Sequence, residues 1–287
     1  MIKRLFLKLW IEVWFYFLAG IQVVLYFPFL VILLLLPKPY SKLFWVARNL
    51  WARITLHGSG YYVKIEDKEK LNSDTNCLII ANHSSHMDVF LMLIAFKKPF
   101  VFVGKKELYK IPLFGYIYKR AAIMVDRSDS KSRFEVYGQA NQMLKEGYNV
   151  CVFPETNYLD DTIILGDFKR GAFKIAIDNN LPIIPLVFYD LKLKHPWFPK
   201  FGSLGKLRVK VLDTINVEGL KEEDTFVNMY ACKTNYKVNN LSSIGIGFDV
   251  YEKIVLNHNF HNVDLVYLIF YENDFDVNIE SQNLTNT

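Results

Sequence analysis

Six residues that follow the apolar run 77–81 combine the side-chain types needed for acid–base chemistry. The stretch from His83 to Asp88 lies between a run typical of a buried strand and a run typical of a helix. A spacing of five residues across such a turn allows the Asp88 carboxylate to fold back onto the His83 ring. A neutral imidazole accepts a proton at cellular pH, and a carboxylate on its other nitrogen fixes the tautomer. We therefore predict that His83 is a general base, oriented by Asp88, for an alcohol that attacks an activated acyl group.

Other interpretations of these residues stay open at this point. Either serine or Asp88 could cap the following helix, because such side chains accept hydrogen bonds from free backbone N–H groups. His83, His86 and Asp88 could bind a metal such as zinc, although the sequence shows no further cluster of ligand residues. A serine hydrolase is disfavoured, since the Gly-Ser-Gly of residues 58–60 lacks the G-x-S-x-G spacing and follows no strand.

Seven short β-type runs alternate with helical stretches beyond residue 60. Such alternation predicts an α/β domain with a largely parallel central sheet flanked by helices. Side chains that follow its strands can then project from one edge of the sheet. The expected strands are 61–66, 77–81, 99–104, 122–126, 149–153, 182–189 and 207–212, and the expected helices are 87–96, 130–146 and 168–179.

The N-terminal segment is the most apolar part of the chain. Residues 13–36 carry no charged side chain. This stretch is long enough to span a bilayer and too long for the apolar core of a secretory signal. Pro28 divides the segment and basic residues flank both ends, so we expect a helix, a bend and a helix that dip into one leaflet. A single spanning helix is the alternative. The amphipathic stretch 41–58 can lie in the plane of the headgroups.

The composition is that of a chain with a sizeable core. It has 287 residues, 52% of them hydrophobic, and 34 basic against 29 acidic residues give a net charge of +5. This mild excess favours an anionic lipid surface or substrate, and we expect no nucleic-acid partner. Three cysteines without C-x-x-C spacing indicate a reducing compartment. We expect a membrane anchor (1–57), a catalytic domain (58–228) and a C-terminal extension of unknown role (229–287).

Residues 83–88, His-Ser-Ser-His-Met-Asp, resemble the HxxxxD block of the glycerolipid acyltransferases, in particular the 1-acyl-glycerol-3-phosphate acyltransferase family. The resemblance implies the glycerolipid acyltransferase fold over most of residues 60–215. Further blocks match in the family's order: GKKEL at 104–108, AAIMVDR at 121–127, FPE at 153–155, FKRGAFKIA at 168–176 and LPIIPL at 181–186.

The resemblance implies a role for five further side chains. Arg127, together with Lys105, would bind the phosphate of the acceptor, since a guanidinium offers a phosphate two parallel hydrogen bonds. Glu155 would contact the acceptor's glycerol or order the basic residues. Lys169 and Arg170 would touch phosphate or the acidic carrier of the donor. Without the resemblance, each of these is an ordinary surface or salt-bridge residue.

The reaction implied by the family is transfer of a fatty acyl group from acyl carrier protein or coenzyme A to the sn-2 hydroxyl of lysophosphatidic acid. It would take place at the cytoplasmic face of the inner membrane, among membrane lipids, with no metal or bound cofactor. This chain departs from the family after Glu155, where Thr-Asn-Tyr at 156–158 replaces Gly-Thr-Arg, which puts the acceptor in question. Another lysolipid acceptor, a lipid hydrolase and a non-catalytic lipid-binding protein are the alternatives.

A last stretch, residues 192–201, mixes basic and aromatic side chains. We expect it to be a surface loop or a second contact with lipid headgroups.

Overall fold

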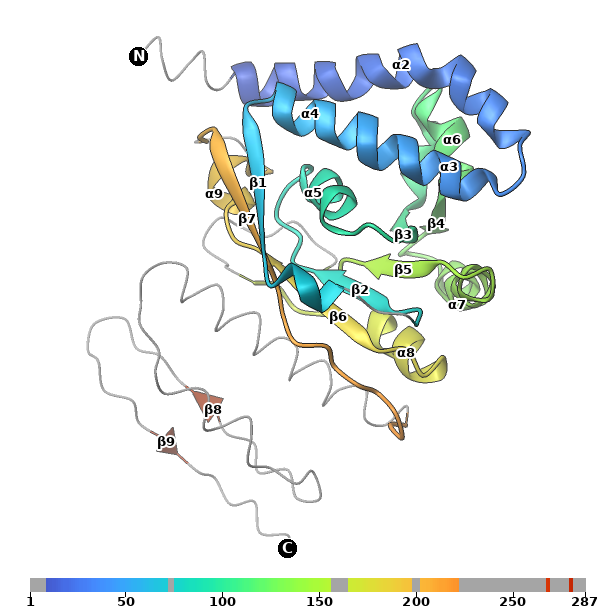
Figure 1. The fold of residues 1–287 in the computed structure, drawn as a ribbon. Helices are drawn as coiled ribbons and strands as arrows, with labels where there is room; N and C mark the ends of the chain where they lie inside the picture. Colours follow the sequence, from blue (N-terminus) through green and yellow to red (C-terminus); the bar gives the residue numbers. More distant parts are fainter. Residues whose placement is uncertain are drawn as a thin grey trace, which may run out of the picture. The chain divides into compact units, whose positions relative to one another are not determined.

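A seven-stranded sheet, with the strand order β1-β7-β6-β2-β5-β3-β4, organises the chain (Figure 1). The computed structural model describes residues 9–71, 75–155, 165–197, 202–221, 267–268 and 279–280. Five of the six neighbouring pairs are parallel and β6–β7 is antiparallel, which confirms the expected largely parallel α/β sheet. The strands are β1 (Tyr61–Glu66), β2 (Leu78–Ala81), β3 (Phe100–Lys105), β4 (Ala122–Val125), β5 (Asn149–Val152), β6 (Ile183–Phe188) and β7 (Gly205–Val211).

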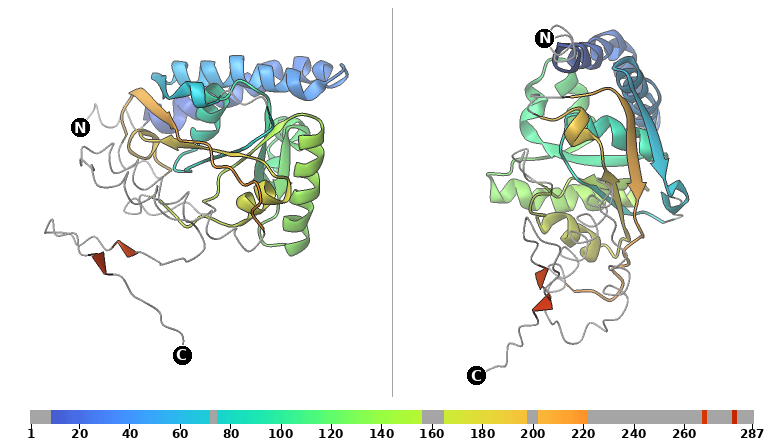
Figure 2. Two further views of the ribbon diagram at one scale, coloured as in Figure 1. Left: turned by 60° about the horizontal axis from the view of Figure 1, so that its bottom comes forward. Right: turned by 90° about the vertical axis from the view of Figure 1, so that its left-hand side faces the viewer.

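Helices cover both faces of the sheet (Figures 1 and 2). Helix α5 (Asp88–Ala95) and the N-terminal helices pack on the face that carries Ile79. Helices α7 (Ser130–Lys145) and α8 (Gly171–Asp178) pack on the opposite face, which carries Ile80. Every residue of β2 and β6 is buried, because a parallel sheet covered on both sides places successive side chains in two separate cores.

Several short elements were not expected from the sequence. Helix α6 (Phe114–Ala121) follows Pro112 and contains Gly115, two residues that usually mark a loop, and its eight residues are too few for a clear period. The others are η3 (Lys68–Leu71), η4 (Lys106–Lys110) and α9 (Leu191–Lys194).

The N-terminal segment forms one long helix rather than two. Helix α2 (Phe15–Leu34) follows the π-helical turn η1 (Trp10–Trp14) and continues through Pro28, so the predicted bend at this proline is wrong. The chain reverses afterwards, where Lys38 has a φ of 51°. Tertiary packing explains the difference, because Leu30 and Leu33 beyond the proline are held against the following helix and compensate for the lost backbone hydrogen bond.

The second helical segment runs back along α2. It comprises α3 (Pro39–Val46), η2 (Ala47–Ala52) and α4 (Arg53–Gly58). Side chains tie the two arms together in antiparallel order: Trp10 Nε1 donates to the carbonyl oxygen of Ser59 at 3.0 Å, and Trp51 Nε1 donates to that of Ala19 at 3.0 Å. This segment packs on α2 along one side, and its expected place in the headgroup plane stays a prediction.

Arg48 shows why this second arm is held so firmly. Its guanidinium donates to the carbonyl oxygens of Phe96 at 3.0 Å and Ile94 at 3.3 Å, at the end of α5. A helix end has carbonyl groups without intrahelical partners, and a cation satisfies them. The arm is thus fixed to the helix that carries Asp88.

Helix α2 is, of the described residues, the one helix long and apolar enough to cross a membrane by length and composition. Its outer side exposes Val24, Leu25, Phe29 and Ile32, each by half or more. Such a continuous apolar surface indicates an association with membranes or with a partner, and together with the composition of the helix it favours a membrane.

The chain divides into two units, residues 1–244 and 245–287. In the second unit the described residues are an antiparallel pair, β8 (Tyr267–Leu268) and β9 (Ile279–Glu280). The expected domain boundaries at residues 57 and 228 stay predictions.

Candidate active site

The end of β2 is fastened to the neighbouring strand β6 by Asn82. The Asn82 side chain accepts a hydrogen bond from the Phe188 backbone N–H at 2.7 Å and donates one to the Phe188 carbonyl oxygen at 3.0 Å. The amide thus continues the pairing of the two strands for one more step. Because the turn that follows starts from a fixed point, the position of His83 is determined by the sheet.

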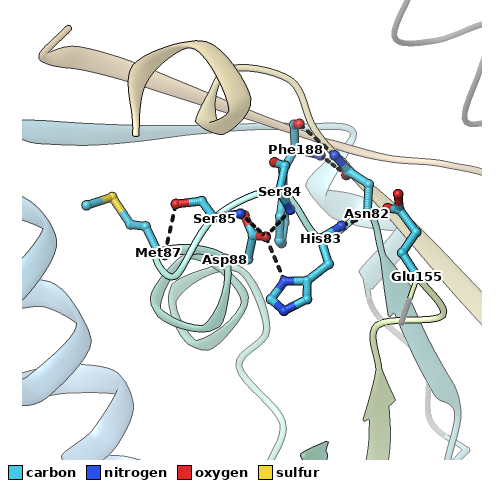
Figure 3. A network of polar contacts seen from close by, with 8 residues as sticks. All are labelled: Asn82, His83, Ser84, Ser85, Met87, Asp88, Glu155 and Phe188. Carbon is cyan, nitrogen blue, oxygen red and sulfur yellow. Dashed lines mark hydrogen bonds and ion pairs between the residues drawn. The ribbon is translucent and has the colours of Figure 1, made fainter. Parts of the chain in front are cut away.

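His83 and Asp88 are in direct contact. The His83 Nδ1 atom lies 2.8 Å from Asp88 Oδ2, and the ring turns toward this carboxylate (Figure 3). Since a carboxylate accepts, Nδ1 carries the hydrogen, and the neutral ring then has Nε2 as its acceptor atom. The His83 side chain is 16% exposed and that of Asp88 is fully buried. The imidazole therefore reaches the surface while its carboxylate partner does not.

The Asp88 carboxylate also shapes the turn. Its Oδ2 atom accepts hydrogen bonds from the backbone N–H groups of Ser84 at 2.6 Å and Ser85 at 2.9 Å. Burial raises the pKa of Asp88, and the hydrogen bond and charge of His83, with these N–H groups, act in the opposite direction. One carboxylate oxygen thus orders both the backbone of the turn and the imidazole ring.

The capping alternative is confirmed in part, for Ser85. Helix α5 has Met87 as its N-cap and no side-chain hydrogen bond there. The Ser85 hydroxyl accepts from the Met87 N–H at 3.1 Å just before the helix, whereas Asp88 accepts from the N–H groups of the preceding turn. For the metal alternative, the part of the chain that the structure describes holds no group of three His, Cys, Asp or Glu side chains suited to a metal ion.

Two aromatic side chains hold the His83 ring from other directions, and neither was predicted to lie at the site. Phe153 stacks on it with ring centres 4.3 Å apart and an interplanar angle of 14°. Trp197 meets it edge-on at 5.4 Å and also packs on His86 at 3.6 Å. Phe153 lies within the FPE block, which is the only sequence signal for it. Trp197, expected in a surface loop, lies at the site; residues 198–201 of that loop are outside the described residues.

Glu155 bridges the His83 turn and a distant segment. Its Oε1 atom accepts from the His83 backbone N–H at 2.9 Å, and its Oε2 atom accepts from the Gly166 N–H at 2.6 Å. Burial raises the pKa of Glu155, whereas these two N–H groups oppose the shift. The side chain is buried and supports the backbone of the site (Figure 3). Its expected contact with the acceptor stays a prediction.

Replacing Glu155 with glutamine should weaken this support. Glutamine has one carbonyl oxygen for two N–H donors, and leaving one buried N–H unpaired costs about 1–3 kcal/mol. We expect the melting temperature to fall by about 5 °C and kcat by about tenfold as the turn shifts, since about 1.4 kcal/mol in the barrier is tenfold in rate. Thermal unfolding and initial rates measure both. The exposed Glu146→Gln is the matched control, and an unchanged melting temperature would contradict the bridging role.

Lys105 and Arg127 leave the same edge of the sheet as His83. Lys105 ends β3 and pairs with Val125 of β4, two residues before Arg127. The Tyr118 hydroxyl donates to the Lys105 carbonyl oxygen at 3.1 Å. Burial raises the pKa of Tyr118, and the charge of Arg127 acts in the opposite direction, so the guanidinium lies nearby. Two cationic residues therefore lie at the carboxyl ends of the neighbouring strands β3 and β4.

Lys105 also lies near the histidines of the turn. Partial burial of the ring lowers the pKa of His86 to about 4, and the charges of His83 and Lys105 act in the same direction. Lys169 and Arg170 are exposed, and the Lys169 N–H donates to the Pro154 carbonyl oxygen at 3.0 Å, beside Glu155. All seven predicted site residues thus lie near the carboxyl ends of the strands or in the segment that is hydrogen-bonded to Pro154 after β5. Residues 156–158, the departure from the family pattern, are outside the described residues.

An oriented imidazole with an apolar ring against it, and cationic residues at the same sheet edge, suit acid–base chemistry on a negatively charged substrate. Comparison with known proteins agrees: the family model described as acyltransferase matches residues 62–189. Residues 62–189 are therefore similar to the acyltransferase family over somewhat less than half of the chain.

The curated relatives are more specific. The chain is 30% identical over 184 residues, 61% of its length, to a chloroplastic 1-acyl-sn-glycerol-3-phosphate acyltransferase of Arabidopsis thaliana, of which it covers 50%. It is 28% identical over 167 residues, 58% of its length, to the human 1-acyl-sn-glycerol-3-phosphate acyltransferase beta, of which it covers 60%. The resemblance stated above is thus confirmed. The chain spans about half the length of the first of these relatives.

A solved structure shows the same fold. The crystal structure of the 1-acyl-sn-glycerophosphate acyltransferase PlsC from Thermotoga maritima superposes with a TM-score of 0.68 at 22% identity, covering 86% of this chain and 98% of that one. This likeness covers more of the chain than the family match does.

Proposed function

We propose that the protein is a membrane-bound O-acyltransferase that forms phosphatidic acid from lysophosphatidic acid. The acyl group would come from a thioester of acyl carrier protein or coenzyme A and would be transferred to the sn-2 hydroxyl. The observation that carries the proposal is the His83–Asp88 contact of 2.8 Å at a ring that reaches the surface. The names of the curated relatives support the substrate.

The mechanism follows from the orientation of the imidazole. Nε2 of His83 takes the proton of the acceptor hydroxyl while its oxygen attacks the thioester carbonyl carbon, and Asp88 stabilises the imidazolium. The tetrahedral intermediate then collapses, the carbon–sulfur bond breaks, and the leaving thiolate takes the proton from the imidazolium. No covalent acyl-enzyme is required, because the substrate's own alcohol is the nucleophile.

Location at a membrane follows from the substrate. Lysophosphatidic acid keeps one acyl chain in the bilayer, and withdrawing it costs about 0.8 kcal/mol for each exposed CH₂. An exposed apolar helix α2 would keep the site beside the lipid. We place the site at the cytoplasmic face, where both thioester donors are found.

The reaction can be tested directly in membranes that contain the purified protein. With a radiolabelled acyl thioester and lysophosphatidic acid, the expected product is phosphatidic acid, and the expected rate of fatty acid release without acceptor is negligible. Release of fatty acid at full rate without lysolipid would instead identify a hydrolase. If the product requires a different lysolipid, the acceptor is wrong while the reaction class holds.

Arg127→Ala tests the phosphate assignment. Charge-assisted hydrogen bonds contribute about 1.5–3 kcal/mol each, so kcat/KM for lysophosphatidic acid should fall by about 100-fold. The same variant should act normally on a monoacylglycerol, which has no phosphate. Arg53→Ala, an exposed arginine on α4, is the matched control. Equal activity of Arg127→Ala and wild type on lysophosphatidic acid would refute the assignment.

A further inference from the structure

An apolar surface separate from α2 lies just after Lys105. In η4, α6 and the turn between them, Leu108, Ile111, Leu113 and Tyr116 are each 37–46% exposed. We define these four side chains as the η4–α6 face. Three exposed aliphatic side chains and one exposed aromatic side chain within nine residues form a patch, and patches of this kind mark interaction sites.

The backbone of this segment holds Leu113 outward under strain. Leu113 has φ 60° and ψ −54°, and the Phe114 N–H donates to the Pro112 carbonyl oxygen at 2.6 Å, which makes a γ-turn of the rare type with positive φ. A branched-chain residue rarely adopts this conformation, whereas glycine does so freely. Leu113 is 37% exposed and does not belong to the buried core, so the unusual backbone conformation points to a role of this turn at the surface.

Basic side chains surround the η4–α6 face. Residues 105–120 contain five cationic side chains and a single acidic one, Glu107. Lys119 lies 4.6 Å from the centre of the Tyr109 ring, and Arg120 lies 3.9 Å from that of Tyr116. Apolar side chains with cations stacked on aromatic rings beside them match the boundary between acyl chains and anionic headgroups. The cationic residues are Lys105, Lys106, Lys110, Lys119 and Arg120.

The face is continuous with α2. Tyr116 meets Phe27 of α2 edge-on with ring centres 5.8 Å apart, and Ile117 packs on the cluster that joins α2 to α3. In Figure 1, α6 lies next to the α2–α3 pair. The η4–α6 face therefore adjoins α2 at Phe27.

We propose that the η4–α6 face is a second lipid-contacting surface that docks on a bilayer with anionic headgroups. This rests on the proposed membrane function and adds how the site is oriented: contacts on both α2 and η4 fix the angle of the domain, with Lys105 at the headgroup level. A single helix leaves the domain free to rotate about it, and a second contact removes that freedom. The exposed aliphatic side chains and the continuity with α2 favour a bilayer over an acidic carrier protein.

Spin labels measure the contact in the full chain. Ile111→Cys and Phe134→Cys, each with Cys232→Ser, are labelled in vesicles of phosphatidylglycerol or phosphatidylcholine; Cys77 and Cys151 are buried. Phe134 is 77% exposed on α7, across the sheet, and serves as the matched site. We expect the label at 111 to collide more with oxygen than with a water-soluble nickel chelate in phosphatidylglycerol vesicles, and the label at 134 to do the reverse.

The charge contribution is tested by replacing Lys106, Lys110 and Lys119 with glutamine. Each lysine near an anionic surface contributes about fivefold in binding, so the triple variant should lose the lipid signal at position 111. In a His83→Ala background, the spin label at position 111 must collide with oxygen and with the nickel chelate as in the wild type, because docking does not depend on catalysis. An aqueous environment at 111 in phosphatidylglycerol vesicles, or lipid-like collisions only after acyl carrier protein is added, would overturn the proposal.

Leu113→Gly separates docking from folding. Glycine accepts the positive φ, so the melting temperature should not fall. We expect kcat/KM for lysophosphatidic acid in anionic vesicles to drop by about tenfold, as for loss of a buried leucine contact, and activity on a short-chain, water-dispersed acceptor to stay unchanged. Phe134→Ser is the matched control. Full activity of Leu113→Gly in vesicles would contradict docking through this turn.

Discussion

Replacing His83 with alanine is expected to lower the rate of acyl transfer by about 10²- to 10⁴-fold, the usual contribution of a positioned general base. The ring is held by Asp88 at 2.8 Å and by the face of Phe153 at 4.3 Å, so its Nε2 atom has one direction in which to act. The rate of phosphatidic acid formation at saturating donor is the measurement. The Michaelis constant for lysophosphatidic acid should change little, because the phosphate contacts remain.

The matched control is His57→Gln. His57 is an exposed histidine at the end of α4, where Nδ1 lies 3.0 Å from the Tyr61 carbonyl oxygen. This variant should keep full activity. Wild-type activity in His83→Ala would show that the alcohol is deprotonated elsewhere, and the mechanism would then have to be abandoned.

Asp88→Asn is expected to lower kcat by about 10³-fold while leaving the protein folded. Asparagine offers one neutral oxygen for the three donors that Oδ2 now accepts, the His83 ring and the N–H groups of Ser84 and Ser85. Its NH₂ group would take the place of Oδ1, a buried atom with no hydrogen-bond partner in the described structure. The imidazolium loses its counter-charge, and the buried amide adds a cost of about 1–3 kcal/mol.

Two measurements separate these effects. Thermal unfolding reports the buried amide, with an expected decrease of about 5 °C in melting temperature, and kcat reports the lost charge. Asp178→Asn, at an exposed carboxylate at the end of α8, serves as the control for both. A loss of stability without a loss of kcat would make Asp88 a structural residue of the turn and nothing more.

The strands and the acid–base pair could be predicted from local sequence patterns. All seven strands were expected within two residues of their observed ends, because buried parallel strands are short apolar runs bounded by turn residues. The contact of His83 with Asp88 was also expected, since five residues across a strand-to-helix turn leave few conformations. The site at the strand ends follows from the parallel order.

Other features depend on residues far apart in the chain. The turn before α3, in place of a bend at Pro28, is decided by the packing of Leu30 and Leu33 on another helix. Trp197 reaches His83 from a loop more than a hundred residues away, and no periodicity marks it. The bonds from Glu155 to the backbone at His83 and Gly166 likewise join three segments.

The sequence by itself determined the α/β class, the residues of the acid–base pair and the apolar N-terminal helix, because each depends on neighbours within one or two turns of chain. Only the tertiary structure decided how the imidazole is held, what Glu155 binds and where α2 turns back. Those contacts close long loops, and the side chains that meet are selected by the packing of whole elements, which a local pattern does not contain.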